Sequence, residues 1–241
     1  MRCFALKNNN KNNNSKPIVI GHRGAKFYAL ENTVNSIKKA VVLKSDMIEL
    51  DIRLTKDNIP IIIHDKKINR TTDGKGRVSK LTLKEIKKFN TNGEKVPTLN
   101  QVLRTFKKQI FNLDIKEYKA VLPALKIIYK NNAEERIKIC SRRAKVLQLV
   151  KHFNPQIETA MVYQFPFRRV MKLANELGMQ AIHPNHYFAT KRLIKRAHKN
   201  NLRVNAWTVN NKNKIQKLIN KEIDGIVTDD PALANSVKNG K

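Results

Sequence analysis

The 241-residue chain lacks the residue patterns that define several common classes of protein. Its only two cysteines, Cys3 and Cys140, stand far apart and predict no disulfide framework. No apolar run approaches the roughly 20 residues that a membrane-spanning helix needs. The first residues also lack the long apolar segment and the small-residue cleavage site of a secretory signal. These absences favour a cytoplasmic protein with its own hydrophobic core.

Acidic residues are scarce, because 19 Asp and Glu stand against 49 Lys and Arg and give a formal net charge of +30. A field of this size attracts nucleic acid, anionic membrane and phosphorylated substrates. The sequence has no zinc-finger spacing, no heptad-linked basic region and no glycine–aromatic RNA-binding signature. The basic residues are also spread along the chain. We therefore expect a solvated lysine-rich surface, with at most weak association with anionic membrane or nucleic acid, and no dedicated protein partner.

The chain divides into a short tail and one long domain. Residues 1–16 are rich in Asn and Lys and cannot bury apolar surface, so we expect a disordered tail. Strand-like runs alternate with helix-like patterns over residues 17–238, which is typical of a parallel sheet. Eight such units make a closed TIM (β/α)8 barrel of roughly 250 residues. The predicted strands lie near 17–21, 47–53, 59–63, 109–115, 136–140, 157–162, 180–183, 202–208 and 224–228. The predicted helices lie near 32–43, 82–89, 98–107, 119–131, 143–152, 167–177, 189–199, 211–219 and 231–238.

Nine strand-like runs are one more than this barrel needs. Run 59–63 follows run 47–53 too closely for a parallel crossover, which takes a dozen or more residues. We therefore expect an antiparallel hairpin after the second barrel strand, which would bring His64 beside Glu49. The turn-rich stretch that follows, 69–96, is predicted to form a short cap-like insertion within the barrel domain.

Three carboxylates occupy predicted barrel strands. Glu49 and Asp51 are two residues apart and therefore face the same side of their strand. Asp114 shares a face of another strand with Asn112 and Lys116, and polar side chains inside a barrel are costly unless they are paired or bind a metal. Carboxylate oxygens suit a hard cation such as Mg²⁺ or Ca²⁺. An internal ion pair between Asp114 and Lys116 is the alternative.

Other candidate site residues also stand at the ends of predicted strands, where the active sites of such barrels are built. Histidine as a residue type titrates near neutrality and can act as acid or base, so His22 and His64 are the candidates for general acid and base. Arg23 offers a bidentate fork to a phosphate, and Lys116 a second contact. Trp207 would either form a wall for the organic part of a substrate or pack in the barrel core, and the sequence favours neither.

The remaining histidines give a weaker signal. His152 and His198 fall in lysine-rich helical patterns and are expected at the surface. His183 and His186 frame a proline at a strand end, a position from which they could line the site.

An ordered series of motifs resembles the glycerophosphodiester phosphodiesterase family and covers nearly the whole chain after Pro17. The motifs are GHRG at 21–24, ENT at 31–33, IELDIRLTKD at 48–57, IIIHD at 61–65, NRTTDGKG at 69–76, VPTL at 96–99, NLDIK at 112–116, AWTVN at 206–210 and DGIVTDDP at 224–231. The resemblance implies a TIM barrel that uses one divalent cation, Mg²⁺ or Ca²⁺. It also implies hydrolysis of sn-glycerol-3-phosphodiesters to glycerol 3-phosphate and an alcohol.

The resemblance also implies a role for each motif residue. These roles are general acid/base for His22 and His64, metal binding for Glu49, Asp51 and Asp114, and phosphate binding for Arg23 and Lys116. The chemistry agrees, since phosphodiester hydrolysis needs charge neutralisation on the non-bridging oxygens, a base for the nucleophile and an acid for the leaving group. Attack by the glycerol 2-hydroxyl, giving a cyclic phosphate, and direct attack by water both stay open.

The chain departs from the family pattern at three places. Leu30 replaces a common proline before ENT and should alter only the entry to the first helix. Asp114 stands where Glu is frequent, which could shift the metal preference or require a bridging water. Arg142 and Arg143 follow Ser141 where Ser-Phe is frequent, so this wall of the site would be more polar and favour a more anionic substrate.

These inferences predict a cytoplasmic enzyme that recycles lipid head-group debris to glycerol 3-phosphate. One alternative is a lysophospholipase D-type hydrolase that acts at a membrane surface, aided by the positive charge. The other is a non-catalytic basic binding protein on the same barrel, against which the intact set of motif residues argues.

Overall fold

A computed structural model describes residues 16–165 and 169–240, so the predicted tail lies outside the described residues except for Lys16. Parallel strands form a closed barrel, since β1 pairs with both β9 and β2. The barrel strands are β1 (Ile18–Gly21), β2 (Met47–Leu54), β4 (Phe111–Ile115), β5 (Ile137–Ser141), β6 (Glu158–Tyr163), β7 (Ala181–Pro184), β8 (Arg203–Ala206) and β9 (Gly225–Thr228). The predicted TIM barrel is thereby confirmed.

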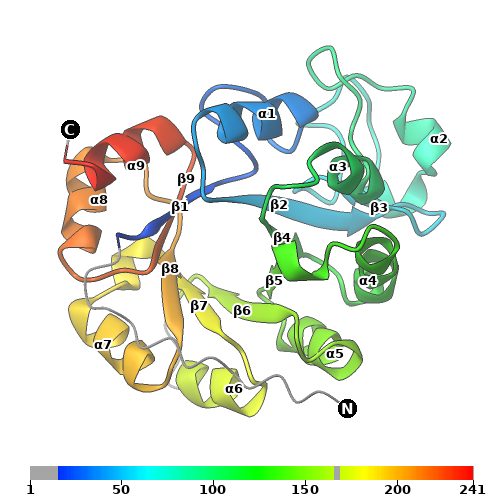
Figure 1. Ribbon diagram of the computed structural model, residues 1–241. Coiled ribbons are helices and arrows are strands. Elements are labelled where there is room, and N and C mark those ends of the chain that lie inside the picture. Colours follow the sequence, from blue (N-terminus) through cyan, green and yellow to red (C-terminus); the bar gives the residue numbers. More distant parts are fainter. Residues whose placement is uncertain (1–15, 166–168, 241) are drawn as a thin grey trace.

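Helices surround these strands (Figure 1). They are α1 (Val34–Val42), α2 (Leu83–Ile86), α3 (Leu99–Thr105), α4 (Val121–Lys130), α5 (Ala144–Phe153), α6 (Val170–Glu176), α7 (Lys191–Lys199), α8 (Lys212–Ile219) and α9 (Pro231–Lys238). Single 3₁₀ turns stand at η1 (Val78–Lys80), η2 (Tyr118–Ala120), η3 (Glu134–Arg136) and η4 (His186–Phe188). None of the helices in the described ranges is both long and apolar enough to span a bilayer.

Alternation along β4 explains how the barrel holds polar groups inside. Phe111, Leu113 and Ile115 are fully buried and belong to the main core, between the strands and the helices. Asn112 and Asp114 alternate with them and face the barrel interior, because successive side chains of a strand point to opposite faces. The apolar outer layer stabilises the fold, and the interior is therefore available for chemistry.

Strand β3 (Pro60–Ile62) runs antiparallel to the end of β2, with Ile52 opposite Ile62. β1 pairs with the start of β2, as far as Ile48, and β3 pairs with the end of β2 along the same edge. The hairpin therefore extends beyond the end of β1. The hairpin and the insertion that follows share a small core, separate from the main one and made of Ile61, Ile63, Ile68, Val78, Ile86 and Val96. Its helix α2 is only one turn long, shorter than the predicted helix at 82–89, and lies outside the ring of barrel helices (Figure 1).

The register of this hairpin differs by one residue from the prediction. The turn closes between Thr55 and Ile59, whose backbone N–H and carbonyl groups hydrogen-bond at 3.2 Å. Extending the pairing by two residues places His64 opposite Leu50 rather than Glu49. His64 still lines the cavity at the mouth of the barrel, because it comes shortly after the last residue of β3, Ile62.

Candidate active site

All the predicted site residues line one cavity at the carboxyl ends of the barrel strands. They are His22, Arg23, Glu49, Asp51, His64, Asp114, Lys116 and Trp207. Loops at this end of a barrel converge on the axis, which brings together residues that are distant in sequence. The structure therefore places every predicted site residue in the same cavity.

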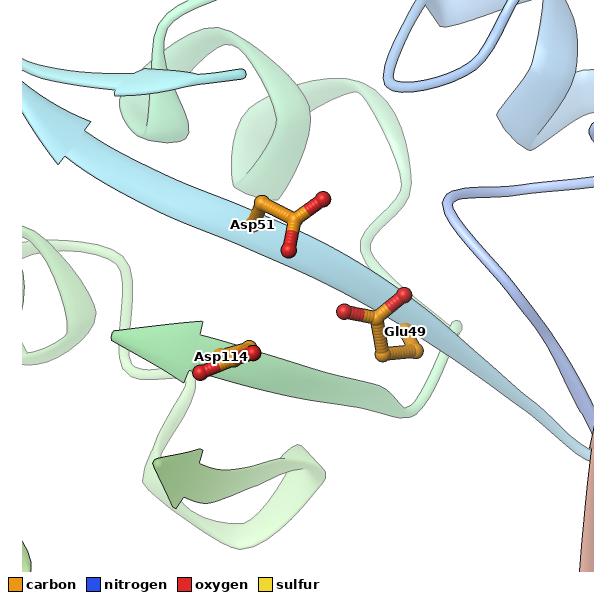
Figure 2. A group of neighbouring side chains, drawn as sticks. All are labelled: Glu49, Asp51 and Asp114. Carbon is orange, nitrogen blue, oxygen red and sulfur yellow. The ribbon is translucent and has the colours of Figure 1, made fainter. Parts of the chain in front are cut away.

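Three buried carboxylates form the floor of the cavity. Glu49 and Asp51 project from β2, and Asp114 projects from the neighbouring β4, where it is the register partner of Asp51 (Figure 2). One oxygen from each lies within 4.8 Å of the others, and the exposed fractions are 7%, 1% and 6%. Such a set of oxygens can hold a divalent cation.

The three carboxylates differ in how readily they ionise. Burial and the neighbouring charge of Asp51 raise the pKa of Glu49 well above its usual range. Burial also raises the pKa of Asp114. Burial acts on Asp51 in the same sense, but the positive charges of Lys116 and Arg23 outweigh it and hold the pKa of Asp51 below its usual range. Lys116 and Arg23 thus stabilise the negative charge of Asp51 more than that of Glu49 or Asp114.

Two features of the cluster fit a divalent cation. Oδ1 of Asp114 is buried and has no hydrogen-bond partner among the described residues, although a buried acceptor is normally satisfied. The cluster also has an excess of negative charge, since among the described residues Lys116 and Arg23 are the cations that form ion pairs with its three carboxylates. Its formal charge of −1 would become +1 with a divalent cation, which suits a phosphodiester of charge −1. The donor set and the charge therefore agree with a hard metal ion.

Lys116 lies inside the carboxylate cluster. Its Nζ is 2.6 Å from Oδ1 of Asp51 and also contacts Oδ2 of Asp114. The internal ion pair considered from the sequence is therefore present, with Asp51 as an additional partner. These carboxylates outweigh the effect of burial and raise the pKa of Lys116, which keeps it charged.

The loop after β1 is built around Arg23. The residue adopts a left-handed backbone conformation with φ of 53°, and its N–H donates to Oε2 of Glu49 at 2.9 Å. Its guanidinium donates to Glu31 at 2.8 Å and approaches Asp51 at 3.2 Å. Gly24 follows with φ of +92°, and a Cβ there would lie 2.6 Å from the carbonyl carbon of Ser36. The backbone and side chain of Arg23 are thereby fixed beside the carboxylates.

His64 belongs to a chain of charged groups that begins on the insertion. Its Nδ1 lies 2.6 Å from Asp65, and Arg70 donates to the other oxygen of Asp65 at 2.7 Å. The hydrogen bond from Arg70 lowers the pKa of Asp65 to about 2. Arg70 also binds both oxygens of Glu31, at 2.6 and 3.0 Å, and Glu31 in turn binds Arg23. The insertion thus connects one histidine to the arginine beside the carboxylates.

His22 has an equivalent partner from the far end of the chain. Its Nδ1 lies 2.6 Å from Oδ1 of Asp229, which follows β9, and the amide of Asn210 donates to the other oxygen at 2.7 Å. Burial alone would raise the pKa of Asp229, but the hydrogen bond and charge of His22 lower it. Each candidate acid/base histidine is therefore held at Nδ1 by a carboxylate.

These supporting residues lie within the family motifs, but the sequence alone indicates no role for them. Glu31, Asp65 and Asp229 are carboxylates that lie in the motifs ENT, IIIHD and DGIVTDDP. Arg70 opens the threonine-rich turn of the insertion, and Asn32 donates to Asp51 at 2.8 Å. Their partners depend on tertiary folding, so spacing alone could not reveal them.

The other side of the cavity, from β5 to β9, is mostly apolar. Trp207 lines it and also packs against the two small interior clusters, so its ring contacts the barrel core and also faces the cavity. Its indole N–H donates to the carbonyl of His183 at 2.8 Å. Burial lowers the pKa of His183 to about 3, so this histidine is neutral at pH 7.

The structure separates the remaining histidines. His183 lines the cavity, but His186 does not and instead stacks on exposed Tyr187. His152 is exposed, as predicted. The surface position predicted for His198 is only partly right, because its ring is 30% exposed and lies 2.7 Å from the half-buried carboxylate of Asp224.

Comparison with known proteins gives concordant matches. A model of the glycerophosphoryl diester phosphodiesterase family matches residues 22–233. A glycerophosphodiester phosphodiesterase of Caldanaerobacter subterraneus is 34% identical over 241 aligned residues, covering 93% of this chain and 99% of that protein. One from Bacillus subtilis is 29% identical over 254 aligned residues, covering 92% and 87%. An Oleispira antarctica phosphodiesterase, solved with its product sn-glycerol-3-phosphate, has a similar fold, with a TM-score of 0.89 at 24% identity over 92% and 97% of the chains.

Proposed function

Because this chain belongs to the glycerophosphoryl diester phosphodiesterase family and is an enzyme of that class, we propose that it hydrolyses glycerophosphodiesters to sn-glycerol 3-phosphate and an alcohol. The observation that carries the proposal is the placement of two carboxylate-held histidines beside three buried carboxylates in one cavity. The sn-glycerol-3-phosphate bound to the Oleispira antarctica relative supports the proposed product.

Glu49, Asp51 and Asp114 would hold one divalent cation, Mg²⁺ or Ca²⁺, which when bound would neutralise charge on the phosphate and polarise the phosphorus. Arg23 and Lys116 would add hydrogen bonds to the non-bridging oxygens. Carboxylates hold both side chains in place before the substrate binds. Little reorganisation of the site would therefore be needed as negative charge develops on the phosphate oxygens during the reaction.

The two histidines would move the protons. A carboxylate at Nδ1 favours the tautomer with a proton on that nitrogen, which leaves Nε2 of His22 and of His64 for acid/base work. One Nε2 would accept the proton of the attacking hydroxyl, from water or from the glycerol 2-hydroxyl. The other would donate a proton to the leaving alcohol oxygen as its bond to phosphorus breaks. Water is consumed overall. By the cyclic route, hydrolysis of the ring reverses the two proton transfers and restores both histidines, whereas after direct attack by water the histidines would regain their starting states by exchanging protons with solvent.

The proposed setting is the cytoplasm, where residues 17–238 would act as one catalytic barrel on small glycerophosphodiesters released from lipids. The membrane-surface hydrolase and the non-catalytic binding protein are not favoured, because nothing in the described residues beyond the positive charge supports them. Any contact with anionic membrane or nucleic acid would be weak and sensitive to salt.

Phosphorus NMR tests the reaction by identifying the bond that is cleaved. Glycerophosphoethanolamine incubated with the protein and Mg²⁺ or Ca²⁺ is expected to give glycerol 3-phosphate and ethanolamine. Formation of phosphoethanolamine and glycerol would contradict the proposal, because the phosphate would then have stayed with the wrong alcohol.

A further inference from the structure

The mouth of the cavity divides into two arcs of different chemistry. The contiguous strands β1, β2 and β4, with the β3 hairpin, supply the histidines, the three carboxylates and the two paired cations. The arc from β5 to β9 supplies Cys140, Arg142, Val162, His183, Trp207 and Val227. With His183 neutral at pH 7, Arg142 is the one charged side chain that the described residues contribute to this second arc.

Arg142 differs from Arg23 and Lys116, the two other basic side chains that line the cavity. Arg23 and Lys116 are both neutralised by carboxylates at 3.2 Å or less. Arg142 is exposed, and its guanidinium lies 4.9 Å from the centre of the Trp207 ring. Within residues 16–165 and 169–240 Arg142 forms no ion pair with a carboxylate, although its charge acts on Asp114 from a longer distance. A cation with no carboxylate partner is therefore presented beside the reacting groups.

We propose that Arg142, stacked on Trp207, binds a negatively charged group on the alcohol part of the substrate. The preferred substrates would then be glycerophosphodiesters whose alcohol carries a carboxylate or a second phosphate. This inference rests on the proposed function, since it concerns the substrates of the same site.

The position of Arg142 separates this role from binding of the reacting phosphate. The phosphate must lie against the first arc, because the two histidines and the carboxylates stand there. A group that reaches β5 and β8 is then another part of the same substrate. The planar guanidinium can bind a carboxylate or a phosphate through two parallel hydrogen bonds, and stacking on the indole holds its plane.

The same arrangement disfavours a cationic alcohol. The face of an indole ring attracts quaternary ammonium groups such as choline. Here the guanidinium already covers the Trp207 ring and would repel a second cation. Arg142 would therefore select for anionic groups and against choline at once, as specificity often requires.

Two substrates that differ by one carboxylate test the proposal directly. Glycerophosphoserine carries the carboxylate that glycerophosphoethanolamine lacks, and kcat/KM for each would be compared in wild type, Arg142→Gln and Arg143→Gln. Arg143 is the control, because it is an exposed neighbouring arginine that does not line the cavity. Thermal unfolding of each variant reports whether the enzyme is folded, independently of its turnover.

The ratio of kcat/KM for glycerophosphoserine to that for glycerophosphoethanolamine is expected to fall about tenfold in Arg142→Gln, the lower end for a hydrogen bond between charged groups. It should be unchanged in Arg143→Gln, while relative turnover of glycerophosphocholine should rise in Arg142→Gln. An equal loss on all three substrates would overturn the proposal and assign Arg142 to the reacting phosphate. An unchanged ratio would also overturn it. Failure of the wild type to hydrolyse any of the three would instead refute the proposed function.

Discussion

Oδ1 of Asp229 lies 2.6 Å from Nδ1 of His22, although 207 residues separate the two in the chain. The contact forms because β9 closes the barrel against β1 and brings the loop after each strand to one edge. Asp65 makes the same contact with His64 at the same distance. The cavity thus contains two histidines that are paired in the same way and that reach it from different loops.

Loss of either histidine should abolish most of the turnover. We expect His22→Ala to lower kcat by about 10²–10⁴, the usual contribution of general acid or base catalysis. Asp229→Asn should lower kcat by less, because the ring remains but its tautomer is no longer fixed. Steady-state kinetics with glycerophosphoethanolamine would measure both, with thermal unfolding as the control for folding. Near-wild-type kcat in Asp229→Asn would show that the carboxylate does not position the histidine.

Glu31 should stabilise the fold in a pH-dependent way. Burial would raise its pKa, but hydrogen bonds from Arg70 and the charge of Arg23 lower the pKa from 4.5 to about 2. Since the folded pKa is the lower one, the stabilisation is fully present above pH 4.5 and is lost as the pH falls towards 2. Glu31→Gln should therefore lower the free energy of unfolding at pH 7 by about 3 kcal/mol.

Denaturant unfolding at several pH values would test this prediction. The difference between wild type and Glu31→Gln should shrink from pH 5 to pH 2.5, while an exposed control, Glu135→Gln, should follow the wild type throughout. A constant difference over this range would mean that the charge of Glu31 contributes nothing and that only its shape matters.

Gly24→Ala should disturb the Arg23 loop through both conformation and space. Gly24 has φ of +92°, and an added Cβ would lie 2.6 Å from a backbone atom of Ser36. We expect a loss of about 1–3 kcal/mol in unfolding free energy, together with reduced turnover. Gly178→Ala is the matched control, because its φ is +57° but no atom in the described part of the chain lies within 4 Å of the added carbon. Equal losses in the two variants would exclude the contact with Ser36 as the cause.

Metal binding should be visible without an activity assay. A ligand that binds only the folded state raises the melting temperature, so Mg²⁺ or Ca²⁺ should raise the Tm of metal-stripped protein. Glu49→Ala should lose this shift together with turnover, because one of three buried carboxylate ligands is gone. Glu135→Ala, on the exposed surface, should keep it. A full shift in Glu49→Ala would place the cation elsewhere.

Much of this arrangement could be predicted from the sequence because strand ends are marked by apolar runs. Residues that end such runs, as His22 does, or that lie two apart on one, as Glu49 and Asp51 do, converge in any closed parallel barrel. The hairpin was predictable from the short connection before β3. The register of the hairpin could not be predicted in the same way. Asn58 adopts a left-handed φ of 59°, and the turn that closes at Thr55 is therefore shorter than expected.

The supporting contacts could not be predicted because they join distant segments. The distance between Glu31 and Arg70 depends on how the insertion folds back over the barrel, and the sequence has no periodic signal for that. The Arg142–Trp207 contact likewise depends on the relative height of β5 and β8 in the barrel. Such contacts follow from the closed fold rather than from any local pattern.

The most direct test of the account is glycerol 3-phosphate release from glycerophosphoethanolamine by metal-stripped protein, before and after addition of Mg²⁺ or Ca²⁺, with His64→Ala in parallel. We predict no release without metal, restored release with one of the two ions, and a loss of at least about a hundredfold in His64→Ala with that ion present. Release that is independent of metal, or that survives in His64→Ala, would contradict the central claim that the carboxylate cluster and the paired histidines act as one site.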